Sequence, residues 1–139
     1  MLVKILRCFI FLLTLNVAAQ ATTVDCQTPL NDTYCYENND NTTFEFVSDD
    51  GSPLNLTFNA GTIEGPPWDL LVVLDSDGTE IYNSANDGQE LTGETFQSTG
   101  DSISFTITSD GSVSCESGAE DLIEYTVNCA TCINPSVEF

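Results

Sequence analysis

From Thr22 onward the chain contains no lysine, no arginine and no histidine. Lys4 and Arg7 are its only basic residues, whereas all 22 Asp and Glu residues lie after Gln20, and the formal net charge is −20. Salt bridges therefore cannot neutralise the carboxylates of the segment that begins at Thr22. These groups must be hydrated, bonded to neutral donors or held against a bound cation.

The same absence excludes several classes of function. Without histidine or lysine the segment from Thr22 onward cannot build a Ser-His-Asp triad, a Schiff base or a phosphate-binding loop. Nucleic-acid binding is excluded because it depends on Lys and Arg neutralising phosphate. Glycoside hydrolysis by two carboxylates, such as Glu64 and Asp69, remains a minor alternative. Because no ring of aromatic residues marks sugar subsites, we predict that the protein is not an enzyme.

The N-terminal segment has the pattern of a secretory signal peptide. Lys4 and Arg7 precede a short apolar run at residues 8–15, and small residues precede Thr22. A membrane span needs about 20 apolar residues, and this run is too short. We therefore predict a signal peptide at residues 1–21, no membrane insertion, and a secreted protein that is extracellular or attached to the cell surface.

The cysteines after this segment are expected to form disulfides, because the protein is predicted to be exported. The sequence alone leaves their pairing open. Proximity along the chain favours Cys26–Cys35 and Cys115–Cys129. Each pair would close a loop of about 10 to 15 residues and stabilise the fold by about 3 kcal/mol.

The C-terminal residues suggest that the chain continues. Cys132 is left without a partner by the predicted pairing, and an alternating apolar pattern begins just before Phe139. We expect residues 131–139 to be a linker or the start of a further domain beyond Phe139, the alternative being a free thiol on a frayed tail.

The remaining segment, residues 22–130, is expected to form one all-β domain, an antiparallel two-sheet β-sandwich. Apolar residues alternate with polar ones in several short runs, as is typical of half-buried strands. Asp-Gly and Gly-Asp turn signals separate these runs. The alternating runs lie at residues 44–46, 54–58, 103–107 and 123–127.

Three other segments complete the expected domain. Residues 70–74 form a continuous apolar run, which predicts a central strand covered on both faces. Residues 75–80 resemble a calcium loop only loosely and are predicted to form a hairpin turn. Residues 22–41 are polar and rich in Asn and Asp, so we expect an irregular arm held by a disulfide.

Three acidic residues lie where predicted strands begin or end. Glu64 and Asp69 flank a Gly-Pro-Pro-Trp loop, and Asp110 follows a later strand. If these ends meet at one edge of the sandwich, the carboxylates converge and their repulsion favours a bound cation. Oxygen ligands without nitrogen or sulfur favour Ca²⁺, with oxygen atoms of the following turn, including Ser112, and water completing the site. The alternative is that Asp69 and Asp110 merely cap turns.

Two segments resemble sequence motifs of CUB domains. Residues 68–78, Trp-Asp-Leu-Leu-Val-Val-Leu-Asp-Ser-Asp-Gly, resemble the strand in which an aromatic-Asp pair leads to an Asp-Gly turn. Residues 98–112, from Ser-Thr-Gly-Asp to Ser-Asp-Gly-Ser, are similar to a second motif of these domains. The resemblance extends over about residues 26–129 and points to CUB-like modules of secreted, multidomain bacterial proteins.

The resemblance implies both a fold and a function. CUB domains are jelly-roll sandwiches, and many hold one Ca²⁺ through acidic residues that correspond to Glu64, Asp69 and Asp110. In these domains the acidic side chains receive a lysine or arginine from a partner. Trp68 could add a stacking surface for sugar or peptide, but packing in the core or at the edge of the site is the favoured interpretation.

The sequence therefore predicts a calcium-binding recognition or adhesion module. Its expected partner is an extracellular protein that presents Lys or Arg, or a glycan. The alternative function is that of an acidic structural spacer without a ligand of its own.

Overall fold

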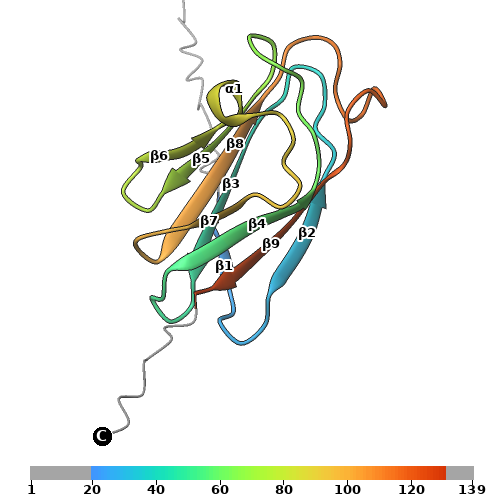
Figure 1. Ribbon diagram of the computed structural model, residues 1–139. Coiled ribbons are helices and arrows are strands. Elements are labelled where there is room, and N and C mark those ends of the chain that lie inside the picture. The colour runs from blue at the N-terminus through green and yellow to red at the C-terminus, as the bar shows by residue number, and fades with distance from the viewer. Residues whose placement is uncertain (1–19, 131–139) are drawn as a thin grey trace, which may run out of the picture.

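The computed structural model describes residues 20–130, which form two stacked β-sheets and one short helix (Figure 1). Most of the predicted signal peptide, and the predicted linker with Cys132, lie outside the described residues. No helix among the residues described is long and apolar enough to cross a membrane. The elements are β1 (Thr22–Val24), β2 (Leu30–Tyr34), β3 (Asn41–Ser48), β4 (Leu54–Ala60), β5 (Leu70–Asp75), β6 (Glu80–Asn83), α1 (Ser84–Asp87), β7 (Thr95–Gln97), β8 (Ser102–Thr108) and β9 (Ile123–Cys129).

The strands are divided between a sheet of five and a sheet of four. Sheet A has the order β1-β3-β8-β5-β6, and sheet B has the order β2-β9-β4-β7. Neighbouring strands are antiparallel except β1, which runs parallel to β3 at the edge of sheet A. This architecture confirms the predicted all-β, two-sheet sandwich.

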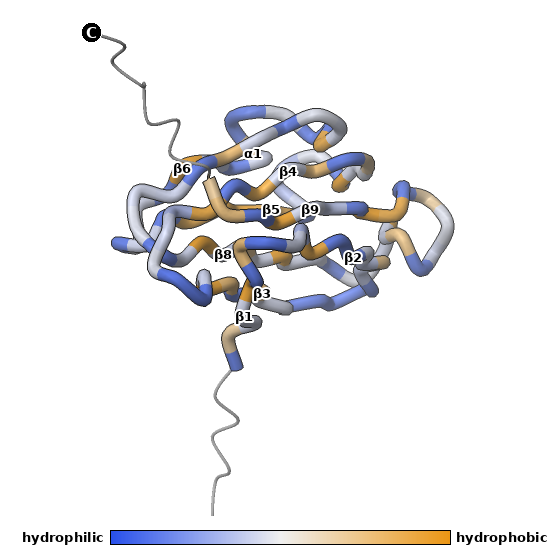
Figure 2. Tube along the Cα trace, turned by 90° about the horizontal axis from the view of Figure 1, so that it is seen from below, coloured by the Kyte–Doolittle hydropathy of each residue, from blue (hydrophilic) through white to orange (hydrophobic). Residues whose placement is uncertain are grey.

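Aromatic side chains from both sheets fill the space between them. Phe105 of β8 stacks on Phe44 with 4.6 Å between ring centroids, and its edge contacts Tyr125 and Phe58 at 5.2 and 5.4 Å. Hydrophobic and hydrophilic residues alternate along several strands (Figure 2), and this alternation explains how the core is formed. In a strand every second side chain faces the same side, so alternation places one set inside the sandwich.

The continuous apolar run is only partly covered. β5 lies between β8 and β6, with Leu71 and Val73 fully buried in the core. Leu70, Val72 and Leu74 point to the outer face of sheet A and are only half-buried. The prediction of a strand covered on both faces is wrong, because among the described residues no layer packs over that side. The predicted hairpin after β5 is confirmed, since β5 pairs antiparallel with β6.

The N-terminal part of the domain is more regular than predicted. It contains β1 and β2 in place of an irregular arm, and each strand pairs with a long strand of the core. These two strands are short and mostly exposed, so they carry no apolar alternation that sequence could show. Their conformation depends on the partner strands β3 and β9.

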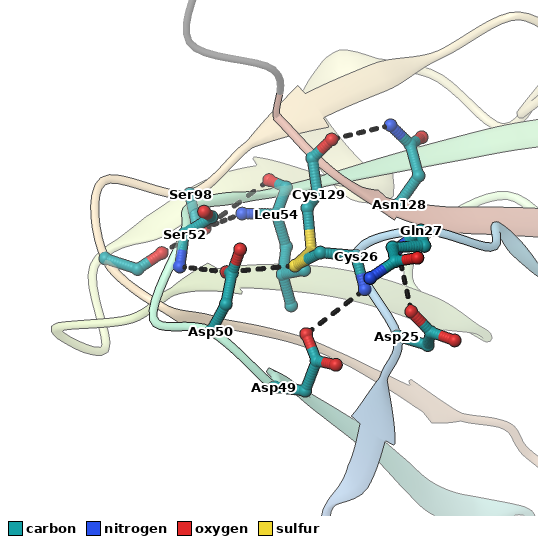
Figure 3. Close-up of a disulfide and its surroundings, with 11 residues drawn as sticks. Asp25, Cys26, Gln27, Asp49, Asp50, Ser52, Leu54, Ser98, Asn128 and Cys129 are labelled. Atoms are coloured by element: carbon teal, nitrogen blue, oxygen red, sulfur yellow. Dashed lines mark hydrogen bonds between the residues drawn. A yellow bond between two sulfur atoms is a disulfide. The ribbon is translucent and has the colours of Figure 1, made fainter.

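Two disulfides join cysteines that are far apart in the sequence. Cys26 bonds Cys129 across 103 residues, and Cys35 bonds Cys115 across 80 residues. In Figure 3 the first bond ties the segment after β1 to the end of β9, with Asp49 accepting a 3.2 Å hydrogen bond from the Cys26 N–H. The four cysteines are paired, but the pairing predicted from proximity is wrong.

The lengths of β2 and β9 explain this correction. β2 separates Cys26 from Cys35, and β9 separates Cys115 from Cys129. A strand of five residues spans about 17 Å, whereas a disulfide requires Cα atoms less than about 7 Å apart. In the chain-entropy model a loop of about 100 residues gives about 4.7 kcal/mol, more than the short loops would.

We expect Phe105→Ala to lower the free energy of unfolding by about 3–5 kcal/mol, because it leaves a cavity among four aromatic rings. Equilibrium denaturation with urea measures this loss. Thr108→Ala, at an exposed position of the same strand, is the matched control and should change stability by less than about 0.5 kcal/mol. A small loss for Phe105→Ala would contradict the described core.

Candidate metal centre

Three carboxylates meet at one end of the sandwich. Ligand oxygens of Glu64, Asp69 and Asp110 all lie within 4.8 Å of one another. Asp69 stands directly before β5, and Asp110 follows β8, which pairs antiparallel with β5. Antiparallel pairing places the start of one strand beside the end of the other, and it brings residues 41 positions apart into contact.

Glu64 reaches this cluster through an irregular segment after β4. Gly61 adopts a φ of 131° and passes so close to β9 that an added Cβ would lie 2.9 Å from the Ile123 Cα atom. Ile63 is buried and its N–H donates to the Gln89 carbonyl at 3.1 Å. The burial and hydrogen bond of Ile63 fix the position of Glu64, the next residue. The half-buried Glu64 side chain points toward the other two carboxylates.

Asp69 is the most buried member of the cluster, with only 1% of its surface exposed. Its Oδ1 atom accepts a 2.9 Å hydrogen bond from the Asp110 N–H. The preceding turn is closed by a hydrogen bond from the Trp68 N–H to the Gly65 carbonyl. The alternative that Asp69 merely caps a turn therefore accounts for its Oδ1 atom. It does not account for the Oδ2 atom.

Asp110 is held by its own turn. Its Oδ1 atom accepts hydrogen bonds from the N–H and the hydroxyl of Ser112, at 2.8 and 3.3 Å. Ser112 is exposed and lies beside the cluster. In this arrangement its hydroxyl orients Asp110, and the other carboxylate oxygen of Asp110 is left for a further partner.

Tyr36 belongs to the site, although nothing in the sequence analysis placed it there. Its ring is fully buried, and its hydroxyl accepts a 3.2 Å hydrogen bond from the Glu64 N–H. Its carbonyl accepts from the Glu116 N–H at 3.1 Å. Tyr36 follows Cys35 directly, so the Cys35–Cys115 disulfide connects this ring to the loop after Asp110. No local pattern in the sequence indicates this contact.

Two buried oxygens of the cluster have no hydrogen-bond partner, namely Glu64 Oε2 and Asp69 Oδ2. Buried polar atoms are nearly always paired, so each exception needs a physical explanation. The chain offers no cationic side chain after Arg7 that could approach them. A bound cation would satisfy both oxygens and remove the repulsion among the carboxylates.

The electrostatics of the cluster oppose the ionised state without a cation. Burial raises the pKa of Asp69, and the charge of Asp110 adds to the rise, whereas the Asp110 N–H and the nearby Tyr36 hydroxyl act to lower it. Burial also raises the pKa of Glu64, with further contributions from the charges of Asp69, Asp110 and Glu120. Perturbed carboxylates that share a site are candidates for a functional role.

A second acidic group does not have the same properties. Asp49 and Asp50 lie close to Cys26 and Cys129. The two sulfur atoms are joined in a disulfide and cannot act as thiolate ligands. Asp50 accepts a hydrogen bond from the Ser52 N–H at 2.9 Å, and hydrogen bonding to this turn lowers its pKa. This group therefore stabilises a turn.

Trp68 lies on the surface next to the cluster. It has 58% of its surface exposed, so packing in the core is wrong and the side chain stands at the edge of the site. It occupies the turn between Glu64 and Asp69, in which the Pro66–Pro67 bond is cis. An exposed tryptophan at the rim of a charged site is a typical anchor for a binding partner.

Comparison with solved structures identifies the fold. The CUB1-EGF-CUB2 domains of rat MASP-1 match with a TM-score of 0.59 and 15% identity, over 80% of this chain and 43% of that chain. The MASP-1 CUB2 domain bound to Ca²⁺ matches with a TM-score of 0.58 and 15% identity, over 79% of this chain and 100% of that chain. No protein-family model and no curated protein sequence matches. The domain therefore has a CUB-like fold, as the motifs predicted.

We expect Asp69 and Glu64 to make the calcium-free protein less stable as the pH rises through the acidic range. Their native pKa values are raised, so the native state binds these protons more tightly than the unfolded chain does. The free energy of unfolding then falls as the pH rises from the unfolded value of about 4 through the native values.

Thermal melts in chelator, from about pH 3 to about pH 7, measure this dependence. Asp69→Asn keeps an oxygen acceptor for the Asp110 N–H but cannot ionise, so its melting temperature should fall less over this range than that of the wild type. Comparing the wild type with Asp69→Asn separates the contribution of Asp69 to the pH dependence from that of the other carboxylates of the chain. Identical pH profiles for the two proteins would contradict the raised pKa of Asp69.

Proposed function

We propose that this protein is a secreted, calcium-binding CUB-like recognition module without catalytic activity. The observation that carries the proposal is the pair of buried carboxylate oxygens, Glu64 Oε2 and Asp69 Oδ2, that lack hydrogen-bond partners in a segment without cationic side chains. The Ca²⁺-bound CUB2 domain of MASP-1, which shares the fold, supports the assignment of the metal.

The donor set favours Ca²⁺ over other biological cations. Glu64, Asp69 and Asp110 offer only carboxylate oxygens, and no histidine or thiolate is near them. Hard oxygen donors suit Ca²⁺, Mg²⁺ and Mn²⁺, and an irregular loop site suits the flexible coordination of Ca²⁺ better than the strict octahedron of Mg²⁺. Oxygen atoms of the Ser112 turn and water would complete six to eight ligands.

The ligand is proposed to be cationic. The same carboxylates that hold the ion stand at the rim of the sandwich, and Trp68 lies exposed beside them. A lysine or arginine from an extracellular protein could pair with the acidic groups while its alkyl chain or charge packs on the indole ring. The chain itself carries no lysine or arginine after Arg7 that would compete. A glycan stacked on Trp68 is the second proposed partner.

Export is proposed from two features. The basic and apolar pattern of residues 1–21 is that of a signal peptide. Disulfides such as Cys26–Cys129 persist in oxidising compartments and are rare in the cytosol. We propose that residues 22–130 are one module of a longer extracellular or cell-surface protein, and that residues 131–139 connect it to a further domain.

We expect Ca²⁺ to raise the melting temperature of the wild-type protein by about 10 °C at a concentration of about 100 times Kd. At that concentration, binding to the native state alone adds about 2.7 kcal/mol, and 1 kcal/mol corresponds to about 4 °C or more in a domain of this size. Differential scanning calorimetry with added Ca²⁺ or chelator measures the shift. Isothermal titration calorimetry gives the affinity directly.

Matched variants test whether the shift comes from this site. Asp69→Asn and Glu64→Gln should remove it, whereas Glu124→Gln, an exposed position on the outer face of sheet B, should retain it. Mg²⁺ in place of Ca²⁺ should give a smaller shift. Equal melting temperatures of the wild type with and without Ca²⁺ would overturn the proposed metal centre.

We expect a lysine-bearing peptide to bind the calcium-loaded protein and to lose about tenfold in affinity with Trp68→Ala. Loss of an exposed aromatic anchor of this kind typically costs about 1–2 kcal/mol. Fluorescence of the single tryptophan reports binding to the wild type, and calorimetry reports binding to both proteins. Glu124→Gln controls for unspecific attraction to the acidic surface.

The same experiment separates the proposed partners. Chelator should abolish peptide binding, because the ion orients the acidic side chains. Binding to a glycan array without peptide binding would favour the glycan. Failure of both would contradict the recognition module and leave the acidic spacer as its function.

A further inference from the structure

A cavity of about 310 Å³ lies on the outer face of sheet A. Ala21, which directly precedes β1, and Glu45 of β3 line it, together with Ser104 of β8 and Asp75 at the end of β5. Because β5 begins at the three carboxylates and ends at Asp75, the cavity lies at the opposite end of this sheet. It is therefore separate from the candidate metal centre.

The strand register places the Ala21–Thr22 peptide bond beside Glu45. β1 runs parallel to β3, with Thr22 opposite Phe46. Phe46 points into the core, so Glu45, its neighbour along the strand, points outward. Ala21 precedes Thr22 and lines the same cavity as Glu45. The backbone nitrogen of Thr22 is thus at the cavity that Glu45 borders.

Two acidic residues line this cavity, and their carboxylates differ in their partners. Asp75 accepts hydrogen bonds from the N–H and the hydroxyl of Thr99, both at 2.8 Å, and from the Ser76 N–H at 2.6 Å. These bonds lower the pKa of Asp75 and direct its oxygens toward neutral donors. Glu45 is exposed on its strand and is the carboxylate available to a cation.

We propose that removal of residues 1–21 leaves the α-ammonium group of Thr22 in this cavity, paired with Glu45. This rests on the proposed export and is independent of calcium. The group is the one full positive charge of the processed domain, because no lysine, arginine or histidine follows Ala21. Processing therefore creates the single ion pair that this acidic domain can form from its own chain.

The pair has a structural consequence for β1. This strand has only three residues and a single neighbour, at the edge of sheet A. Cys26, just after the strand, is fixed by its bond to Cys129. The Thr22–Glu45 pair fixes the other end, so both ends of the edge strand are held only after processing.

The test uses the absence of lysine. In a protein that begins at Thr22, the α-amino group is the only amine, so reductive methylation with ¹³C-formaldehyde labels that site alone. NMR then follows its titration. The pKa should exceed the usual 7.7–8.0 in the wild type and should be about 0.5 lower in Glu45→Gln. Glu124→Gln removes an equal charge from the other sheet and should leave the value unchanged.

Two results would overturn the proposal. The first is an equal pKa in the wild type and Glu45→Gln. The second is an exported protein whose N-terminal sequence, determined by Edman degradation or mass spectrometry, begins elsewhere than Thr22. Calcium titration of the same samples reports the metal centre independently, so failure of this proposal and failure of the proposed function are distinguishable.

Discussion

The absence of positive side chains is the constraint on which the rest of this structure depends. Apart from Glu45 in its proposed pair with the α-ammonium group of Thr22, every carboxylate in the described domain must be stabilised by neutral donors, water or an external cation. Asp75 shows the first solution, because the backbone and hydroxyl groups of Thr99 and Ser76 surround it and lower its pKa. Asp69 shows where this solution fails, since one oxygen accepts the Asp110 N–H and the other is buried without a donor. The difference between these two aspartates separates a structural role from a candidate binding role.

The same constraint explains where the acidic residues lie. Like charges directly opposite each other on neighbouring strands destabilise a sheet, and this chain has no lysine or arginine to alternate with them. The outer face of sheet B accordingly presents a row of neutral polar side chains that lie opposite one another across four strands, namely Asn31, Thr126, Thr57 and Thr95. Most carboxylates are therefore in turns and at strand ends, which is where three of them can converge.

Sequence reasoning predicted the features that depend on local periodicity. The alternating strands, the hairpin after β5 and the sandwich follow from patterns of two residues and from turn chemistry. The candidate site followed from strand ends, and the structure places Glu64, Asp69 and Asp110 together. The disulfide pairing could not be predicted in this way, because Cys26 and Cys35 are close in sequence but are held apart by the full length of β2.

The contribution of Tyr36 also depends on tertiary structure, and it links the disulfide to the candidate metal centre. Its hydroxyl accepts the Glu64 N–H, and its backbone carbonyl accepts the Glu116 N–H. Glu116 follows Cys115, whose bond to Cys35 closes this part of the domain. The loop that carries Asp110 and the segment that carries Glu64 are therefore both bonded to one buried residue, Tyr36. Because the disulfide persists only under oxidising conditions, the geometry of the carboxylates is coupled to the compartment in which the chain folds.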